Sequence, residues 1–190
     1  MARWEPDARE RLVRAALDLF SEQGYDNTTV AQIAERAGLT KSTFFRHFPD
    51  KREVLVAGQD TLCRLFADAI AAAPATATPL EAVAAALDAA AEAFTPEQRD
   101  LGPKVQAVIA ASSELQVRDA LKQVGLAAAM TQALQQRGVP DPAASLAAEF
   151  GVLAFQRAFA RWSHPANKQE LGELARQSLG ELQAASAALS

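Results

Sequence analysis

The chain has 190 residues, of which 49% are hydrophobic and 22% charged, and its formal net charge is −4. This length is enough for one large domain or two small ones with a buried core. No stretch approaches the ~18 uninterrupted apolar residues that a membrane-spanning helix needs, and the charged start lacks the apolar core of a signal peptide. We therefore expect a cytoplasmic protein that does not associate with membranes. A single cysteine, Cys63, excludes an internal disulfide, and two distant histidines predict neither a metal site nor a cofactor.

Positive charge is concentrated in one short window of this acidic chain. Residues 36–52 hold five basic residues and one acidic residue, which gives the window a net charge of +4. For a polyanionic partner, such local concentration matters more than the charge of the whole chain. Taken by itself, the window can also be interpreted as a solvated helix face, because most runs of charged residues are of that kind.

The spacing of apolar residues predicts an all-α fold. They recur three or four positions apart along the chain, and no segment alternates in the manner of a strand. Thr29, Asp50, Thr78, Thr95 and Asn167 are each followed three residues later by Glu or Gln, as in a capping box at a helix start. The segment 116–137 is apolar on two sides, which predicts a central helix. Together these signals predict about nine helices, over residues 6–23, 30–38, 41–48, 51–72, 80–94, 96–112, 116–137, 142–163 and 168–188.

The second and third predicted helices form a helix-turn-helix. They are joined by a tight turn at Gly38, and the third helix lies in the basic stretch LTKSTFFRHFPDK, residues 39–51. In such a unit the second helix enters the major groove of DNA. Lys41 and Ser42, in its first turn, can reach base edges, while Arg46, His47 and Lys51 recur at later turns and can contact the backbone.

Residues 8–66, with GYDNTTVAQIAERAGLTKSTFFRHFPDKREVL at their centre, resemble the DNA-binding domain of TetR-family transcriptional repressors. The resemblance implies a three-helix helix-turn-helix domain followed by a larger helical bundle for ligand binding and dimerisation. It implies that Thr29 caps the second helix and contacts a phosphate, and that Phe45 replaces a phosphate-contacting tyrosine. The family pattern further assigns the groove-facing start to Thr40, Lys41, Ser42 and Thr43, and the backbone grip to His47 and Lys51.

The resemblance also implies a division of the chain. Residues 1–50 are expected to form the DNA-binding domain, with the matched region running into a linking helix over residues 51–72. Residues 51–190 are expected to bind a small-molecule effector and to form a homodimer. The family pattern places a set of apolar residues around the effector, although the same residues could simply pack in the core. These residues are Phe66, Phe94, Val105, Val108, Ile109, Met130, Phe150 and Phe155.

The last two predicted helices carry small and apolar strips that are typical of a dimer interface. Packing against the chain's own earlier helices is the alternative, but two-fold symmetric operators and the family resemblance favour an intersubunit four-helix bundle. The predicted interface residues are Gly151, Ala154, Ala158, Leu171, Leu174 and Leu182.

The function predicted from these features is a sequence-specific regulator, most simply a repressor that a small, largely apolar effector releases from double-stranded operator DNA. The alternative is a helical small-molecule-binding protein that does not bind DNA, which the net negative charge and the phenylalanine at position 45 favour. An enzyme is not expected, because the sequence has no nucleophile-base arrangement, no glycine-rich phosphate loop and no metal-ligand cluster.

Overall fold

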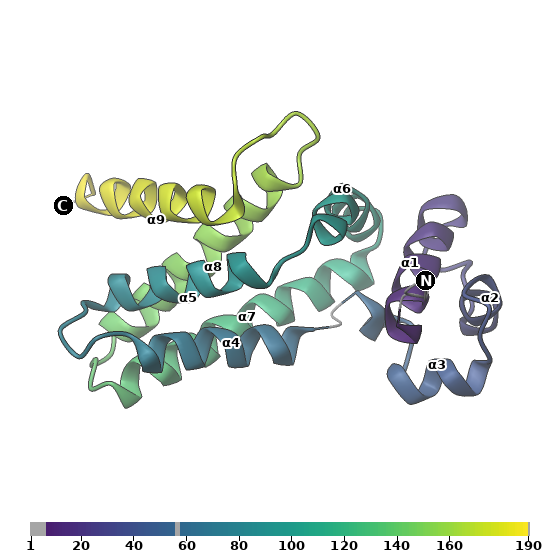
Figure 1. Ribbon diagram of the computed structural model, residues 1–190, viewed down its shortest axis with the longest axis horizontal. Helices are drawn as coiled ribbons and strands as arrows, with labels where there is room; N and C mark the ends of the chain where they lie inside the picture. Colours follow the sequence, from purple (N-terminus) through teal and green to yellow (C-terminus); the bar gives the residue numbers. More distant parts are fainter. Residues whose placement is uncertain (1–6, 56–57, 190) are drawn as a thin grey trace, which may run out of the picture. The chain divides into compact units, whose positions relative to one another are not determined.

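The computed structural model describes residues 7–55 and 58–189. Within these ranges all regular structure is helical, as the sequence predicts (Figure 1). The helices are α1 (Ala8–Gln23), α2 (Val30–Arg36), α3 (Lys41–His47), a short 3-10 helix η1 (Arg52–Val54), α4 (Gln59–Ala72), α5 (Pro79–Ala93), α6 (Pro96–Ala110), α7 (Ser113–Gln136), α8 (Ala143–Trp162) and α9 (Leu171–Ala187). None of these helices is long and apolar enough to cross a membrane.

The chain divides into two compact units. The first contains Met1–Ala57 together with Lys104–Ala120, and the second contains Gly58–Pro103 together with Leu121–Ser190. The predicted division after residue 50 is continuous along the chain, whereas the first unit is built from two separate segments. Sequence patterns report local helices well, but they do not reveal that a segment from the middle of the chain packs on the N-terminal helices.

The first unit has its own hydrophobic core. Helix α2 packs on both α1 and α3, and α3 also contacts α1. Their apolar faces bury Leu12, Phe20, Ile33 and Phe44, and the later segment adds Val108 and Leu115 to the same cluster. Short helices such as α2 and α3 have little stability in isolation, so this shared core holds them in place.

Most of the predicted helix starts are confirmed. Thr29 and Thr78 form capping boxes with Gln32 and Glu81, and Thr95 exchanges hydrogen bonds with Gln98 in the same way. The helix start predicted at Asn167 is wrong, because α9 begins at Leu171. The Asn167 side chain instead forms hydrogen bonds with the backbone of Gln169, in the loop before α9.

The fourth helix also begins later than predicted. Asp50 Oδ1 accepts hydrogen bonds from the backbone N–H groups of Arg52 and Glu53, and this arrangement closes the 3-10 turn. Helix α4 starts only after Gly58, whose φ of 98° is a left-handed conformation that glycine adopts without strain. Residues 56 and 57, within the predicted helix, lie outside the described residues, as does residue 6 of the first predicted helix.

The second unit is an alanine-rich bundle. Helix α4 packs on α5, and α5 packs on both α8 and α9, which pack on each other. Small residues such as Ala82, Ala86 and Ala90 line the inner face of α5 and let its neighbours approach closely. Larger side chains from several helices fill the rest of the core, among them Phe66, Ile70, Leu126, Met130, Leu134 and Leu174.

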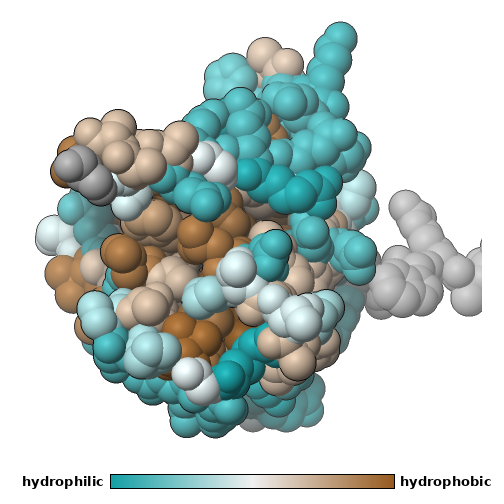
Figure 2. Space-filling model, turned by 90° about the vertical axis from the view of Figure 1, so that its left-hand side faces the viewer, coloured by the Kyte–Doolittle hydropathy of each residue, from teal (hydrophilic) through white to brown (hydrophobic). Residues whose placement is uncertain are grey.

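Not every apolar strip is covered. Of the two apolar sides predicted for α7, the one with Leu126, Met130 and Leu134 is buried, but Leu121 and Val124 are exposed. The prediction of a fully central helix is therefore wrong for that side. Figure 2 shows further apolar side chains at the surface of the second unit, recessed below the C-terminal end of α9 and bordered by hydrophilic residues.

Candidate DNA-binding surface

Helix α3 has one buried side and one exposed side. Its N-terminus is capped by Thr40, whose Oγ1 accepts a hydrogen bond of 3.1 Å from the Thr43 N–H. Phe44 and Phe48 are buried with their ring centroids 5.5 Å apart, and they anchor the helix in the core of the first unit. Phe45 points away from that core and is 51% exposed. The tight turn before the helix places Gly38 at a φ of +66°.

The exposed side of α3 collects the residues that the sequence predicts to contact DNA. Lys41, Ser42, Phe45 and Arg46 are exposed, and Thr43 is half-buried beside them. The side chains of Lys41 and Arg46 have no hydrogen bond or ion pair with any residue in the described part of the chain. Their charges are thus available to an external anion.

The start of α2 offers a second exposed polar group. Thr29 Oγ1 accepts a hydrogen bond from the Gln32 N–H at 3.3 Å, and Gln32 Oε1 accepts one from the Thr29 N–H at 2.8 Å. Gln23 Nε2 donates to the same Gln32 oxygen at 3.4 Å, which ties the end of α1 to this cap. The reciprocal bonds fix the backbone at Thr29 while its side chain stays at the surface.

Two other cations of the basic window, Arg36 and Arg52, are already paired with carboxylates. The Arg36 guanidinium binds both carboxylate oxygens of Glu22, at 3.0 and 2.8 Å. Arg52 binds Asp50 Oδ2 at 2.6 Å, and this guanidinium holds the pKa of the Asp50 carboxyl below its usual value. The net +4 read from the sequence therefore overstates the charge presented to a partner.

The structure differs most from the family pattern at Lys51. Its Nζ donates to the backbone carbonyls of Tyr25 and Thr28, at 2.8 and 3.1 Å, and lies 4.1 Å from the centroid of the Tyr25 ring. His47 is half-buried, and its Nε2 has no hydrogen-bond partner among the residues that the structure describes. The predicted backbone grip by Lys51 would require it to leave its present partners.

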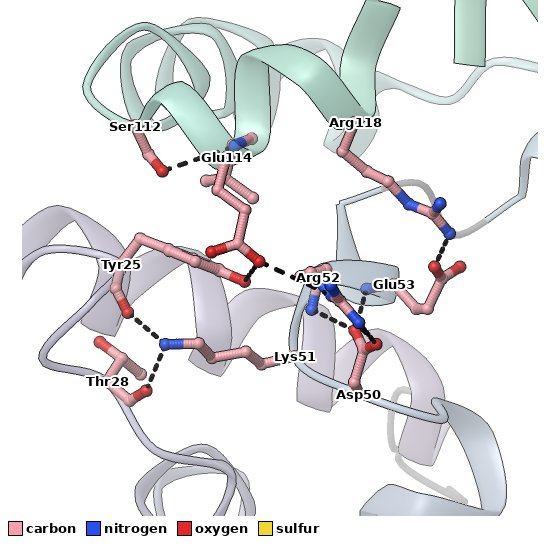
Figure 3. A network of polar contacts seen from close by, with 10 residues as sticks. Tyr25, Thr28, Asp50, Lys51, Arg52, Glu53, Ser112, Glu114 and Arg118 are labelled. Atoms are coloured by element: carbon pink, nitrogen blue, oxygen red, sulfur yellow. Dashed lines mark hydrogen bonds and ion pairs between the residues drawn. The ribbon is translucent and has the colours of Figure 1, made fainter. Parts of the chain in front are cut away.

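Within the first unit, a polar network joins the segment Lys104–Ala120 to the N-terminal segment (Figure 3). The Tyr25 hydroxyl donates to Glu114 Oε1 at 3.3 Å, and Arg52 lies 3.7 Å from the same oxygen. Burial, with the adjacent Glu114 carboxylate, raises the pKa of Tyr25 well above its usual value. Glu53 forms an ion pair with Arg118, which adds a further link. No sequence signal pointed to these contacts, because their partners are about 60 to 90 positions apart.

The residues predicted to surround an effector are only partly brought together. Phe66, Phe94 and Phe155 meet in an aromatic cluster in the second unit, where Phe155 lies 5.6 Å from each of the other two ring centroids. Met130 and Phe150 belong to the same core. The other three lie in the first unit, where Val108 is buried in its core, Ile109 packs against that core and Val105 is half-buried.

The residues predicted for a dimer interface are mostly covered by the chain itself. Gly151, Ala154, Ala158, Leu171 and Leu174 are all buried within this single chain, and Leu182 packs against the same core. A Cβ on Gly151 would meet Val83 Cγ1 at 2.6 Å, so α8 and α5 are in close contact at this point. Within the chain, α5 supplies the surface on which these residues pack, and the intersubunit interface stays a prediction.

Comparison with known proteins agrees with this arrangement. The model of the bacterial regulatory proteins of the tetR family matches residues 12–57. The HTH-type transcriptional regulator TcmR of Streptomyces glaucescens is 43% identical over 81 residues, which cover 43% of this chain and 36% of that protein. The chain thus spans about a third of the length of this relative.

Two solved structures share the fold over most of the chain. One is FadR of Thermus thermophilus, a TetR-family transcriptional repressor in complex with lauroyl-CoA. The superposition covers 92% of this chain and 93% of the FadR chain, with 24% identity and a TM-score of 0.53. The other is the SmeT–triclosan complex. The superposition covers 95% of this chain and 91% of the SmeT chain, with 21% identity and a TM-score of 0.59. Residues 12–57 of the chain are therefore similar to the N-terminal domain of the bacterial regulatory proteins of the tetR family.

Proposed function

We propose that the protein is a sequence-specific DNA-binding transcriptional regulator, a repressor that a small apolar effector releases from its operator. The observation that carries this proposal is the exposed side of α3, where Lys41, Ser42, Phe45 and Arg46 share one surface above a buried Phe44. Unpaired cations beside groups that can contact base edges are what major-groove recognition requires.

Each exposed group has a distinct proposed role. Lys41 and Ser42, in the first turn of α3, contact base edges, with Thr40 and Thr43 beside them at the groove. Arg46 contacts a phosphate, as does Thr29 at the start of α2, and His47 lies at the edge of this surface. Phe45 lies beside the backbone phosphate that a tyrosine would contact at this position in the family pattern, and its ring contacts a thymine methyl group. A homodimer would place two such helices in successive major grooves, about 34 to 36 Å apart.

The effector is proposed to bind in the second unit. Support comes from the aromatic cluster around Phe155 and from two structural relatives that were solved with lauroyl-CoA and with triclosan, both of which carry apolar groups. An effector releases DNA only if it binds the released form more tightly, and coupling of this kind is typically about 1 to 3 kcal/mol. The effector-binding residues are proposed to be Phe66, Phe94, Met130, Phe150 and Phe155.

The test of DNA binding begins with selection of duplexes from a random-sequence pool by the purified full-length chain. Fluorescence anisotropy then measures affinity for the selected duplex and for a scrambled one at several salt concentrations. A regulator gives a two-fold symmetric selected site and an affinity that falls steeply with salt. A helical ligand-binding protein without DNA binding would enrich no sequence.

Two substitutions on α3 should separate base contacts from phosphate contacts. Lys41→Ala is expected to cost about 1 to 3 kcal/mol on the selected duplex and little on the scrambled one. Arg46→Ala is expected to weaken both duplexes alike and to lower the slope of log affinity against log salt by about one. Lys168→Ala, an exposed lysine in the second unit, is the control and should change neither value. Wild-type affinities and slopes in both α3 variants would contradict the proposed docking.

The phenylalanine at position 45 offers a gain-of-function test. Phe45→Tyr adds the hydroxyl that the family pattern carries, on a side chain that is already exposed. If α3 docks as proposed, the new phosphate hydrogen bond should strengthen duplex binding by about 1 kcal/mol. Phe48→Tyr is the contrasting variant, since that ring is buried and cannot reach DNA. Anisotropy titrations at one salt concentration suffice, and weaker binding by Phe45→Tyr would place this side chain away from the backbone.

A further inference from the structure

Lys51 occupies a site in which most of its hydrogen-bonding capacity is already used. An ammonium group has three N–H donors and no acceptor. Two of them are directed to the carbonyl oxygens of Tyr25 and Thr28, at 2.8 and 3.1 Å, and Nζ also lies 4.1 Å from the centroid of the Tyr25 ring. A cation at this distance from an aromatic ring is attracted by the negative charge on its face. The ammonium is therefore solvated by the protein rather than directed at an external phosphate.

The groups that Lys51 holds form the turn between α1 and α2. Thr28 is buried, its N–H donates to the Tyr25 carbonyl at 3.2 Å, and its Oγ1 donates to the Gly24 carbonyl at 2.8 Å. The next residue is Thr29, the capping residue of α2 and a proposed phosphate contact. The position of Thr29 thus depends on a turn whose two carbonyls are held by Lys51, as Figure 3 shows for Tyr25 and Thr28.

The location of Lys51 connects this turn to the recognition helix. Lys51 comes four residues after His47, the last residue of α3, and just before η1. Phe48, between them, is fixed in the core of the first unit. A bond network from Lys51 to the turn therefore sets where the start of α2 lies relative to the end of α3, both of which the proposed function places against DNA.

We infer that Lys51 is a positioning residue of the DNA-binding surface, which holds the Tyr25–Thr28 turn so that Thr29 meets a phosphate, and that it does not itself neutralise a phosphate. This inference rests on the proposed function, because it assigns a role within the same surface. It also revises the role that the family pattern gives to this lysine.

The salt dependence of DNA binding distinguishes the two roles. Lys51→Met keeps the length of the apolar stem and removes the charge, and Arg46→Met is the matched control on α3. Lys51→Met is expected to weaken binding to the selected duplex by about tenfold, the cost of losing hydrogen bonds to a charged group. Its salt slope should equal that of the wild type, whereas Arg46→Met should lower the slope by about one. A slope lowered by about one in Lys51→Met would overturn the inference.

A double-mutant cycle then asks whether Lys51 acts through Thr29. Thr29→Ala is measured in the wild-type background and in Lys51→Met. If Lys51 positions Thr29, the threonine substitution should cost clearly less in the Lys51→Met background, because the contact is already impaired. Strictly additive losses would mean that Lys51 only stabilises the domain, which overturns the positioning role. Lys51→Arg retains a cationic donor and should recover part of the lost affinity.

A measurement on the free protein separates this inference from the proposed function. Hydrogen exchange of the amides over residues 28–33 should be faster in Lys51→Met than in the wild type, while Arg46→Met should leave it unchanged. If the wild-type chain selects no duplex, the proposed function fails, and the exchange data still show whether Lys51 holds the turn. Unchanged exchange in Lys51→Met would overturn the inference even if the wild type binds DNA.

Discussion

Replacing Leu115 with alanine is expected to lower the free energy of unfolding of the first unit by about 2 to 5 kcal/mol. Leu115 is 1% exposed and belongs to the same apolar cluster as Leu12, Phe20 and Phe44. The substitution removes buried methyl groups and leaves a cavity beneath the helices that carry the proposed DNA contacts. Because a domain this small has a modest total stability, a loss of this size should also weaken DNA binding.

The control for Leu115→Ala lies on the same helix. Val117 is 62% exposed, so Val117→Ala should change stability by no more than about 0.5 kcal/mol. Hydrogen exchange over residues 30–48 reports on the first unit directly, and DNA affinity is measured on the selected duplex. Exchange at the wild-type rate in Leu115→Ala would show that the mid-chain segment does not support the N-terminal helices.

Replacing Arg137 with methionine is expected to destabilise the second unit by about 1.5 to 3 kcal/mol, the range for hydrogen bonds to a charged group. Among the residues that the structure describes, no carboxylate pairs with the Arg137 guanidinium, which instead donates to four backbone carbonyls where α4 ends. These are the carbonyls of Ile70, Ala71, Ala73 and Pro74, at 3.1, 3.4, 2.7 and 2.6 Å. The last carbonyls of a helix lack partners in the next turn, and Arg137 supplies donors to this end of α4 and the residues after it. The Ile70 and Pro74 carbonyls also accept from the N–H groups of Ala73 and Ala77.

Urea unfolding followed by circular dichroism measures this loss as a lower midpoint. Arg64→Met is the matched control, since Arg64 is exposed on α4 and donates to a single carbonyl, that of Asp60 at 3.3 Å. Hydrogen exchange over residues 66–74 should accelerate in Arg137→Met and not in Arg64→Met. Equal midpoints in the two variants would contradict the capping role of Arg137.

The helix-turn-helix could be predicted in detail because its signals are local. Thr29 and Thr40 cap the helices that follow them, Gly38 makes the turn, and alternate burial of Phe44 and Phe45 follows from the pitch of a short helix. Each of these features is determined by residues within a few positions of one another. The exposure of Lys41 and Arg46 follows in the same way from the helical period.

The contacts that the sequence did not reveal depend on distant partners. Gly151 and Ala154 have the small side chains of an intersubunit contact, but α5 of the same chain occupies the space beside them. Lys51 has the charge of a phosphate contact, yet the carbonyls that bind it come from a turn 23 to 26 residues earlier. The type of a side chain shows what it can bind, whereas only the folded chain shows which partner lies beside it.

Because the first unit combines Met1–Ala57 with Lys104–Ala120, its sequence is interrupted by part of the second. During synthesis, the ribosome must deliver the chain beyond Leu115 before Val108 and Leu115 can complete the core that supports α3. The same arrangement constrains protein engineering. A chimera that joins the proposed DNA-binding domain to a foreign ligand-binding domain at residue 57 would discard those side chains, so both segments must be transplanted together.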